Sequence, residues 1–123
     1  MAAKRILVAD DDRSTRELIS LILEDEGYEV ITAVNGVETV KKATAEQPDL
    51  VVLDIMMPEM DGYEALNKIK DDSQLADIPI LVITARTIKI YEKISKGLGA
   101  IDHITKPFSP DDLVSKIKSV LGE

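Results

Sequence analysis

An uninterrupted apolar run that ends in one carboxylate, residues 50–54 with the sequence LVVLD, constrains the fold more than any other stretch. A strand with apolar side chains on both faces must be covered on both faces, which is typical of a central strand in a parallel sheet. Its last residue, Asp54, is then expected at the carboxyl edge of that sheet, where open α/β folds build their sites. The segment 55–62 leads into a further helix, for which Asp61 is the expected N-cap.

The chain repeats a short apolar strand followed by an amphipathic helix five times. Such alternation predicts one parallel sheet with right-handed crossovers and helices on both faces. We therefore expect an α/β fold, a doubly wound (βα)5 sheet in the order 2-1-3-4-5 with a flavodoxin-like three-layer α/β/α architecture. The expected strands are 6–9, 28–33, 50–54, 78–84 and 101–105, and the expected helices run from Ser14 to Gly27, from Asn35 to Pro48, over 62–72 and 87–96, and from Ser109 to Gly122.

Apolar spacing predicts which helix faces are buried. The first helix is expected to begin with an S-x-x-E capping box made by Ser14 and Glu17, and Asn35 is expected to cap the second. The expected buried positions are Leu18, Ile19, Leu21 and Ile22 in the first helix, Val37, Val40 and Ala43 in the second, Ala65, Leu66 and Ile69 in the third, and Leu113, Ile117, Val120 and Leu121 in the last.

Composition limits the classes of protein that fit. Fifteen Lys and Arg against 23 Asp and Glu give a net charge of -8, which disfavours direct nucleic-acid or membrane binding and favours a cation or a basic partner. The absence of cysteine excludes disulfides, thiolate catalysis and Cys-ligated zinc. With 123 residues, the chain is expected to form one domain, 1–123, without an output domain. Its first apolar run is too short for a signal peptide or a membrane span, so we expect a cytoplasmic protein.

Chemically useful side chains follow four of the five expected strands. Asp10 and Asp11 follow the first, Asp54 ends the third, Thr84 ends the fourth and Lys106 follows the fifth. Because parallel strands end at the same edge, these residues are expected to converge, with the three carboxylates on neighbouring strands. Each like charge raises the pKa of its neighbours unless a cation lies among them. All-oxygen ligands with room for water favour Mg²⁺.

The same edge suits phosphoryl chemistry. The Asp54 carboxylate can act as a nucleophile toward phosphorus and form an aspartyl phosphate. Phosphoryl transfer needs positioning and charge neutralisation, which a metal on one side and the Lys106 ammonium on the other would supply. Thr84 offers a hydroxyl donor to one phosphoryl oxygen. Asp54, Thr84 and Lys106 are therefore the predicted catalytic residues.

Four short motifs occur in a characteristic order and spacing. They are VADDD at 8–12, VLDIMMPEMDG at 52–62, ITA at 83–85 and KPF at 106–108. On these motifs the chain resembles the receiver domain of bacterial two-component response regulators, in particular the single-domain chemotaxis type. The resemblance covers essentially the whole chain. It implies a signalling switch, not an enzyme with an external substrate, since a receiver catalyses only its own phosphorylation and dephosphorylation.

The resemblance also implies roles for particular residues. Asp54 would accept the phosphoryl group from a phosphohistidine on a sensor histidine kinase or a phosphotransfer protein. Asp11 and Asp54 would ligate Mg²⁺ through their side chains and Met56 through its backbone carbonyl, while Asp10 would act mainly through metal-bound water. The bond between Lys106 and the following proline would be cis.

Activation would work through a switch pair. In the family, the residue at Thr84 is drawn toward the phosphoryl group, and an aromatic residue three before the lysine turns inward with it. This changes the face formed by the fourth helix, fifth strand and fifth helix, which contacts a downstream protein target. Here that position holds His103 instead of Tyr or Phe, and two interpretations stay open: a half-buried structural histidine, or a pH-sensitive switch.

Other functions compete with this interpretation. Asp10 and Asp12 match the D-x-D motif of haloacid dehalogenase-type phosphatases, with Asp10 as nucleophile, and the layered fold also suits a flavodoxin-like electron carrier. A receiver cut from a larger DNA-binding or enzymatic response regulator would give the same sequence. A stand-alone receiver would serve as a diffusible switch or as a phosphorelay intermediate. We expect a monomer that could dimerise on phosphorylation.

Overall fold

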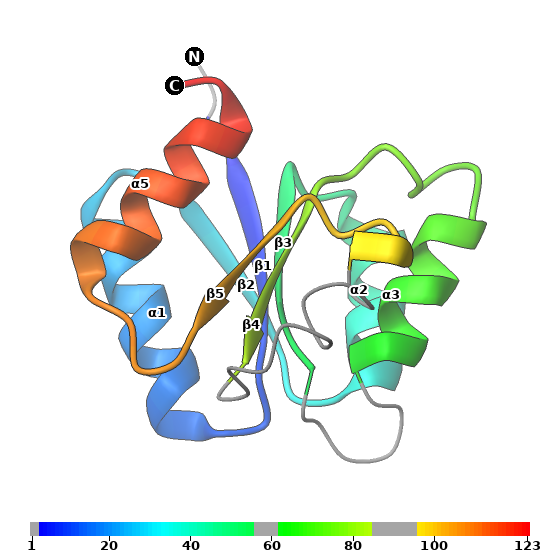
Figure 1. Cartoon of the computed structure of the whole chain (residues 1–123), viewed down its shortest axis with the longest axis horizontal. Coiled ribbons are helices and arrows are strands. Elements are labelled where there is room, and N and C mark those ends of the chain that lie inside the picture. The colour runs from blue at the N-terminus through cyan, green and yellow to red at the C-terminus, as the bar shows by residue number, and fades with distance from the viewer. Residues whose placement is uncertain (1–2, 56–61, 85–95) are drawn as a thin grey trace.

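Five parallel strands form the centre of the molecule. The computed structural model describes residues 3–55, 62–84 and 96–123. The sheet has the order β2-β1-β3-β4-β5, as predicted (Figure 1). Its strands are β1 (Arg5–Ala9), β2 (Glu29–Ala33), β3 (Leu50–Asp54), β4 (Ile80–Thr84) and β5 (Asp102–Thr105).

Helices cover both faces of this sheet, which gives the predicted three layers. In Figure 1, α1 and α5 lie on one side of the sheet and α2 and α3 on the other. The described helices are α1 (Arg13–Asp25), α2 (Gly36–Glu46), α3 (Gly62–Asp71) and α5 (Pro110–Leu121). The helix predicted at 87–96 lies outside the described residues except for Lys96, as does the predicted cap Asp61. Within the described ranges no helix is long and apolar enough to cross a bilayer.

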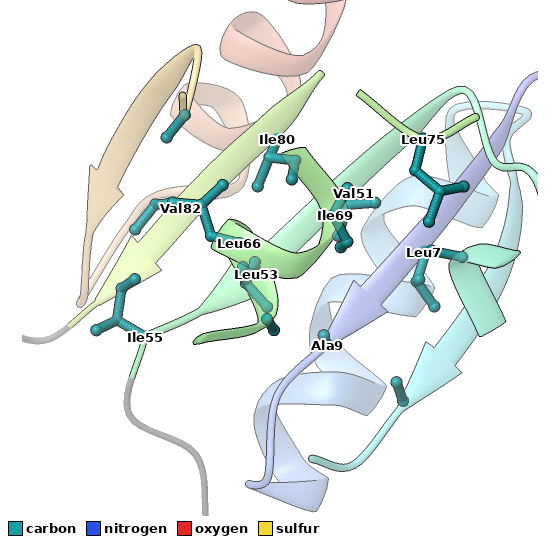
Figure 2. Packing of buried hydrophobic residues seen from close by; sticks show 14 residues of the cluster. Leu7, Ala9, Val51, Leu53, Ile55, Leu66, Ile69, Leu75, Ile80 and Val82 are labelled. Atoms are coloured by element: carbon teal, nitrogen blue, oxygen red, sulfur yellow. The ribbon is translucent and has the colours of Figure 1, made fainter. Parts of the chain in front are cut away.

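The core has two halves because side chains alternate along each strand. Leu7 and Ala9 point toward α2 and α3 and join the cluster drawn in Figure 2, whereas Ile6 and Val8 pack with residues of α1 and α5. All five residues of β3 are buried. The LVVLD run is therefore a central strand, as its sequence predicts.

The first helix begins two residues earlier than predicted. Asp12, not Ser14, is its N-cap, and the Asp12 carboxylate accepts hydrogen bonds from Thr15 N at 3.2 Å and Thr15 Oγ1 at 2.5 Å. Both Asp and Ser are good N-caps, so propensity alone does not choose between them. Here the Asp12 backbone N–H is also held by Asp10 Oδ1 at 2.9 Å, which fixes the turn ahead of the helix.

The predicted buried face of α1 is partly wrong. Ile19 and Leu23 are buried, whereas Leu18 and Leu21 are 50% and 69% exposed. The buried residues stand four apart on one stripe, and the two exposed leucines lie beside that stripe. In α2, Val37 is also exposed. The residues that α2 buries are Gly36, Thr39 and Ala43, with Val40 partly buried.

The other predicted ends and faces agree more closely. Asn35 and Ser109 cap α2 and α5 through side-chain oxygens, and Gly122 ends α5 in the left-handed conformation. Strand β4 begins at Ile80 instead of residue 78, but the Pro79 carbonyl still accepts from Val51 N at 3.0 Å. The buried faces of α3 and α5 contain the predicted Ala65, Leu66, Ile69, Leu113 and Ile117.

Candidate functional site

The ends of four strands bring the predicted residues to one edge. Ala9 pairs with Leu53 of the adjacent strand, so Asp10, which directly follows β1, lies beside Asp54, which ends β3. On its other side β3 pairs with β4, and there Asp54 is opposite Ile83, the residue before Thr84. This register follows from parallel pairing, and it places the acids of β1 and β3 side by side as the sequence predicts.

Three carboxylates form a compact acidic cluster. Oxygen atoms of Asp10, Asp11 and Asp54 lie within 4.8 Å of one another. Asp10 is fully buried and Asp54 is 3% exposed, whereas Asp11 is exposed to solvent. Two like charges about 4 Å apart repel by roughly 4 kcal/mol at an effective dielectric constant of about 20. Repulsion of this size favours a positive charge among the acids.

Lys106 supplies one such charge. Its Nζ atom lies 2.8 Å from Asp10 Oδ2 and 3.2 Å from Asp54 Oδ2. Burial lowers the pKa of Lys106, but the hydrogen bond to Asp10 and the charges of Asp54 and Asp10 outweigh burial and raise it overall. The ammonium therefore stays charged and neutralises one of the three acids. Its backbone N–H donates to Thr84 O at 2.8 Å, and the Lys106-Pro107 bond is cis, as the resemblance implies.

The buried Asp10 is held at every polar atom. Its N–H donates to Ala33 O at 3.2 Å, Oδ1 accepts from Asp12 N, and Oδ2 accepts from Lys106 Nζ. Its backbone carbonyl accepts from Arg16 Nη1 at 2.9 Å. Sequence reasoning missed Arg16. The available signal was its spacing one turn after the acidic run, but Arg13 on the same helix carries the same charge and is an equally plausible candidate from the sequence.

The other predicted site residues are Thr84, His103 and Met56, and the structure describes the first two. Thr84 is 5% exposed at the end of β4, one strand from Asp54. His103 lies in β5 with a quarter of its side chain exposed, and its Nδ1 is 3.9 Å from Asp102 Oδ1. Asp102 also pairs with Lys116 of α5 at 3.1 Å. Met56, the predicted backbone ligand, lies outside the described residues.

The donor set fits a hard cation. Its ligand atoms are carboxylate oxygens, and one of the acids is exposed, which leaves room for water and a further oxygen ligand. One ammonium opposite three carboxylates leaves an excess of negative charge that a divalent ion would offset. The edge can therefore hold a metal ion beside a carboxylate that is nearly buried.

Comparison with known families identifies this arrangement. Residues 6–118 match the model of the response regulator receiver domain. The chain belongs to the response regulator receiver family. A receiver is a phosphorylation-activated signalling switch of two-component systems and not a typical enzyme. This membership decides against the haloacid dehalogenase and flavodoxin alternatives.

The receiver has close relatives among curated transcriptional regulators. It is 42% identical over 118 residues to the alkaline phosphatase synthesis transcriptional regulatory protein PhoP of Bacillus subtilis, covering 96% of this chain and 48% of PhoP. It is 40% identical over 121 residues to the phosphate regulon transcriptional regulatory protein PhoB of Pseudomonas aeruginosa, covering 98% of this chain and 53% of PhoB. The chain thus spans about half the length of the curated relatives it matches.

Solved receivers match over nearly their full length. The Vibrio cholerae chemotaxis protein CheY4 is 35% identical with a TM-score of 0.92, and the match covers 97% of this chain and 99% of CheY4. The receiver domain of the Pseudomonas aeruginosa sensor histidine kinase PA1611 is 25% identical with a TM-score of 0.91, and the match covers 99% of this chain and all of that domain. These similarities confirm the predicted flavodoxin-like fold.

Proposed function

We propose that Asp54 is the phosphoryl acceptor of this receiver. The supporting observation is its position: a nearly buried carboxylate at a strand end, with Asp10 and Asp11 within 4.8 Å and the Lys106 ammonium 3.2 Å away. The donor is a phosphohistidine on a sensor histidine kinase or a phosphotransfer protein, which would meet the receiver in the cytoplasm.

In the proposed step, an Asp54 carboxylate oxygen forms a bond to phosphorus while the bond from phosphorus to the donor imidazole breaks. The imidazole nitrogen leaves with that electron pair and takes a proton, and the product is an aspartyl phosphate. Lys106 is already beside Asp54, so its ammonium can offset charge on the phosphoryl oxygens. The Thr84 hydroxyl is the proposed donor to another of them.

Mg²⁺ is the proposed cofactor. Asp11 and Asp54 would hold the ion through side-chain oxygens, Asp10 through bound water, and Met56 through its backbone carbonyl. When bound, the ion supplies positive charge for the transferred phosphoryl oxygens. The solved PA1611 receiver, which has the same fold, is described with a magnesium ion coordinated in its active site cleft, and that similarity supports the choice of metal.

Signalling would run from Thr84 and His103 to a downstream protein target. We propose that residues 1–123 act as one receiver unit, monomeric until phosphorylation, with no direct contact to nucleic acid. A second candidate function is the receiver part of a longer transcriptional regulator, which the half-length match to PhoP and PhoB favours. His103 stays a proposed switch residue. The nearby Asp102 carboxylate would pair with a protonated imidazole.

Incubation with acetyl phosphate and Mg²⁺, followed by intact mass measurement, tests the acceptor. We expect one phosphoryl adduct on the parent protein and none on Asp54→Asn. An adduct that persists in Asp54→Asn would refute the assignment of Asp54. Multiple turnover on phosphate esters that is lost in Asp10→Asn would point to phosphatase chemistry instead. A phosphotransfer screen against histidine kinases, with Asp54→Asn as control, would then identify the donor.

A further inference from the structure

Arg16, in the second turn of α1, connects that helix to the acidic turn at residues 10–12. Its Nη1 donates to the backbone carbonyl of Asp10 at 2.9 Å. Its backbone N–H donates to Asp12 O at 3.0 Å, and Asp12 N donates back to Asp10 Oδ1 at 2.9 Å. The side chain and backbone of Arg16 therefore hold the first and last residues of the turn.

Arg13, one turn earlier on the same helix, makes no comparable contact with the described residues. It pairs with Glu17 at 2.8 Å, and their side chains are 83% and 66% exposed. Arg16, by contrast, is partly buried between the helix and the loop after β1. The chain therefore offers two arginines of equal charge, three positions apart, of which one contacts the site and the other does not.

The turn held by Arg16 carries two of the three acids. With Arg16 in place, the N–H, the carbonyl and both carboxylate oxygens of Asp10 all have partners, so Asp10 is fixed at four points. Asp11 is exposed, and among the described residues its carboxylate has no hydrogen-bond partner. The position of Asp11 is therefore set by the backbone of the turn.

We propose that Arg16 is a positioning residue for the cation site: it fixes the 10–12 turn so that Asp10 and Asp11 are preorganised to hold Mg²⁺ beside Asp54. This inference rests on the proposed function. Residues that orient metal ligands without touching the metal typically change affinity by about 10- to 100-fold when they are lost.

Loss of the Arg16 charge and loss of its positioning role predict opposite changes in Mg²⁺ affinity. A guanidinium near a cation site repels the cation, so loss of an arginine should, by charge alone, tighten Mg²⁺ binding slightly. Loss of positioning should weaken it. Arg13→Ala is the control for charge, because it removes the same charge from the same helix, and the contact that it loses is with Glu17 and not with the turn.

Isothermal titration with Mg²⁺ tests the proposal. We expect Arg16→Ala to weaken binding by about 10-fold, Arg13→Ala to bind as tightly as the parent or slightly tighter, and Arg16→Lys to recover part of the loss by donating to the same carbonyl. Arg16→Gln serves the same purpose if Arg16→Ala does not fold. Arg16 variants that bind Mg²⁺ as tightly as Arg13→Ala would overturn the proposal.

A kinetic measurement supplies the second readout. Phosphorylation of Arg16→Ala by acetyl phosphate should need about 10-fold more Mg²⁺ for half-maximal rate, with most of the parent rate recovered at saturating Mg²⁺. A lower maximal rate with an unchanged Mg²⁺ requirement would contradict positioning. A parent protein that binds no Mg²⁺ would overturn both the proposed function and this inference. A parent that binds Mg²⁺ and is phosphorylated on Asp54, with neutral Arg16 variants, would overturn this inference alone.

Discussion

Gly62 is where the start of α3 touches the backbone behind Asp54. Its N–H donates to Ile55 O at 2.9 Å. A Cβ atom added to Gly62 would lie 2.4 Å from Ile55 Cα and 2.5 Å from the Asp54 carbonyl oxygen, whereas ordinary contacts begin near 3.4 Å. The obstructing atoms are backbone and cannot rotate away. Gly62→Ala therefore requires the two segments to separate by about 1 Å.

Two opposing contributions determine how much Gly62→Ala changes the free energy of unfolding. Overpacking costs about 1–3 kcal/mol. Replacing Gly by Ala in a helix interior returns about 1 kcal/mol, but Gly62 is the first residue of α3 and should regain little of it. We therefore expect Gly62→Ala to lose about 1–3 kcal/mol of unfolding free energy. The functional loss should be larger, because a misplacement of about 1 Å at a reacting group can reduce a rate by about 100-fold.

Urea unfolding and acetyl phosphate labelling measure the two effects separately. Gly97→Ala is the matched control, since a Cβ there meets no atom within 4 Å and the residue is helical. We expect the control to be as stable as the parent or slightly more stable, and to be phosphorylated at the parent rate. If Gly62→Ala matched Gly97→Ala in both assays, the backbone contact would not be what positions Asp54.

Three further predictions concern the scaffold. Burial and the hydrogen bond to Glu123 raise the pKa of Tyr28 to about 12. The stability gained from its neutral phenol should be complete below about pH 10 and lost as pH rises through the folded pKa. Tyr28→Phe should therefore remove a phenolate that titrates near pH 12 in ultraviolet absorbance. Asn35→Ala removes the cap of α2 and should cost about 1 kcal/mol in urea unfolding, whereas Asn35→Asp should not. Lys70 Nζ donates to Ala76 O at 2.9 Å and Ile78 O at 2.8 Å. Lys70→Met should therefore speed amide hydrogen exchange at residues 72–78 while leaving that of β1 unchanged.

The fold could be predicted because its signals are local and redundant. A run such as LVVLD at 50–54 must be covered on both faces, and alternating strands and helices can satisfy that only in a parallel sheet. The site then follows from topology: all strand ends share one edge, so Asp10, Asp54 and Thr84 had to converge once the strand order was known.

What the sequence left undecided depends on packing between elements. On α1, Leu18 and Leu21 are as apolar as Ile19 and Leu23, and it is packing against the sheet and α5 that selects the second pair. Arg16 shows the same limit. Its value for the site comes from reaching a carbonyl in another element, and neither composition nor helical spacing distinguishes it from Arg13.

Lys106 links the acidic cluster to strands β4 and β5. Its ammonium contacts Asp10 and Asp54, while its backbone N–H is bonded to Thr84 O, and Thr84 pairs with Thr105 of β5. A phosphoryl group on Asp54 would add oxygens that carry more negative charge than the esterified carboxylate, and these oxygens would compete with Asp10 and Asp54 for the Lys106 ammonium. We therefore expect any movement of Lys106 to be transmitted first to Thr84 and to β5, the strand that carries His103. Lys106 is hydrogen-bonded to Thr84 through its backbone and directly follows Thr105, the last residue of β5.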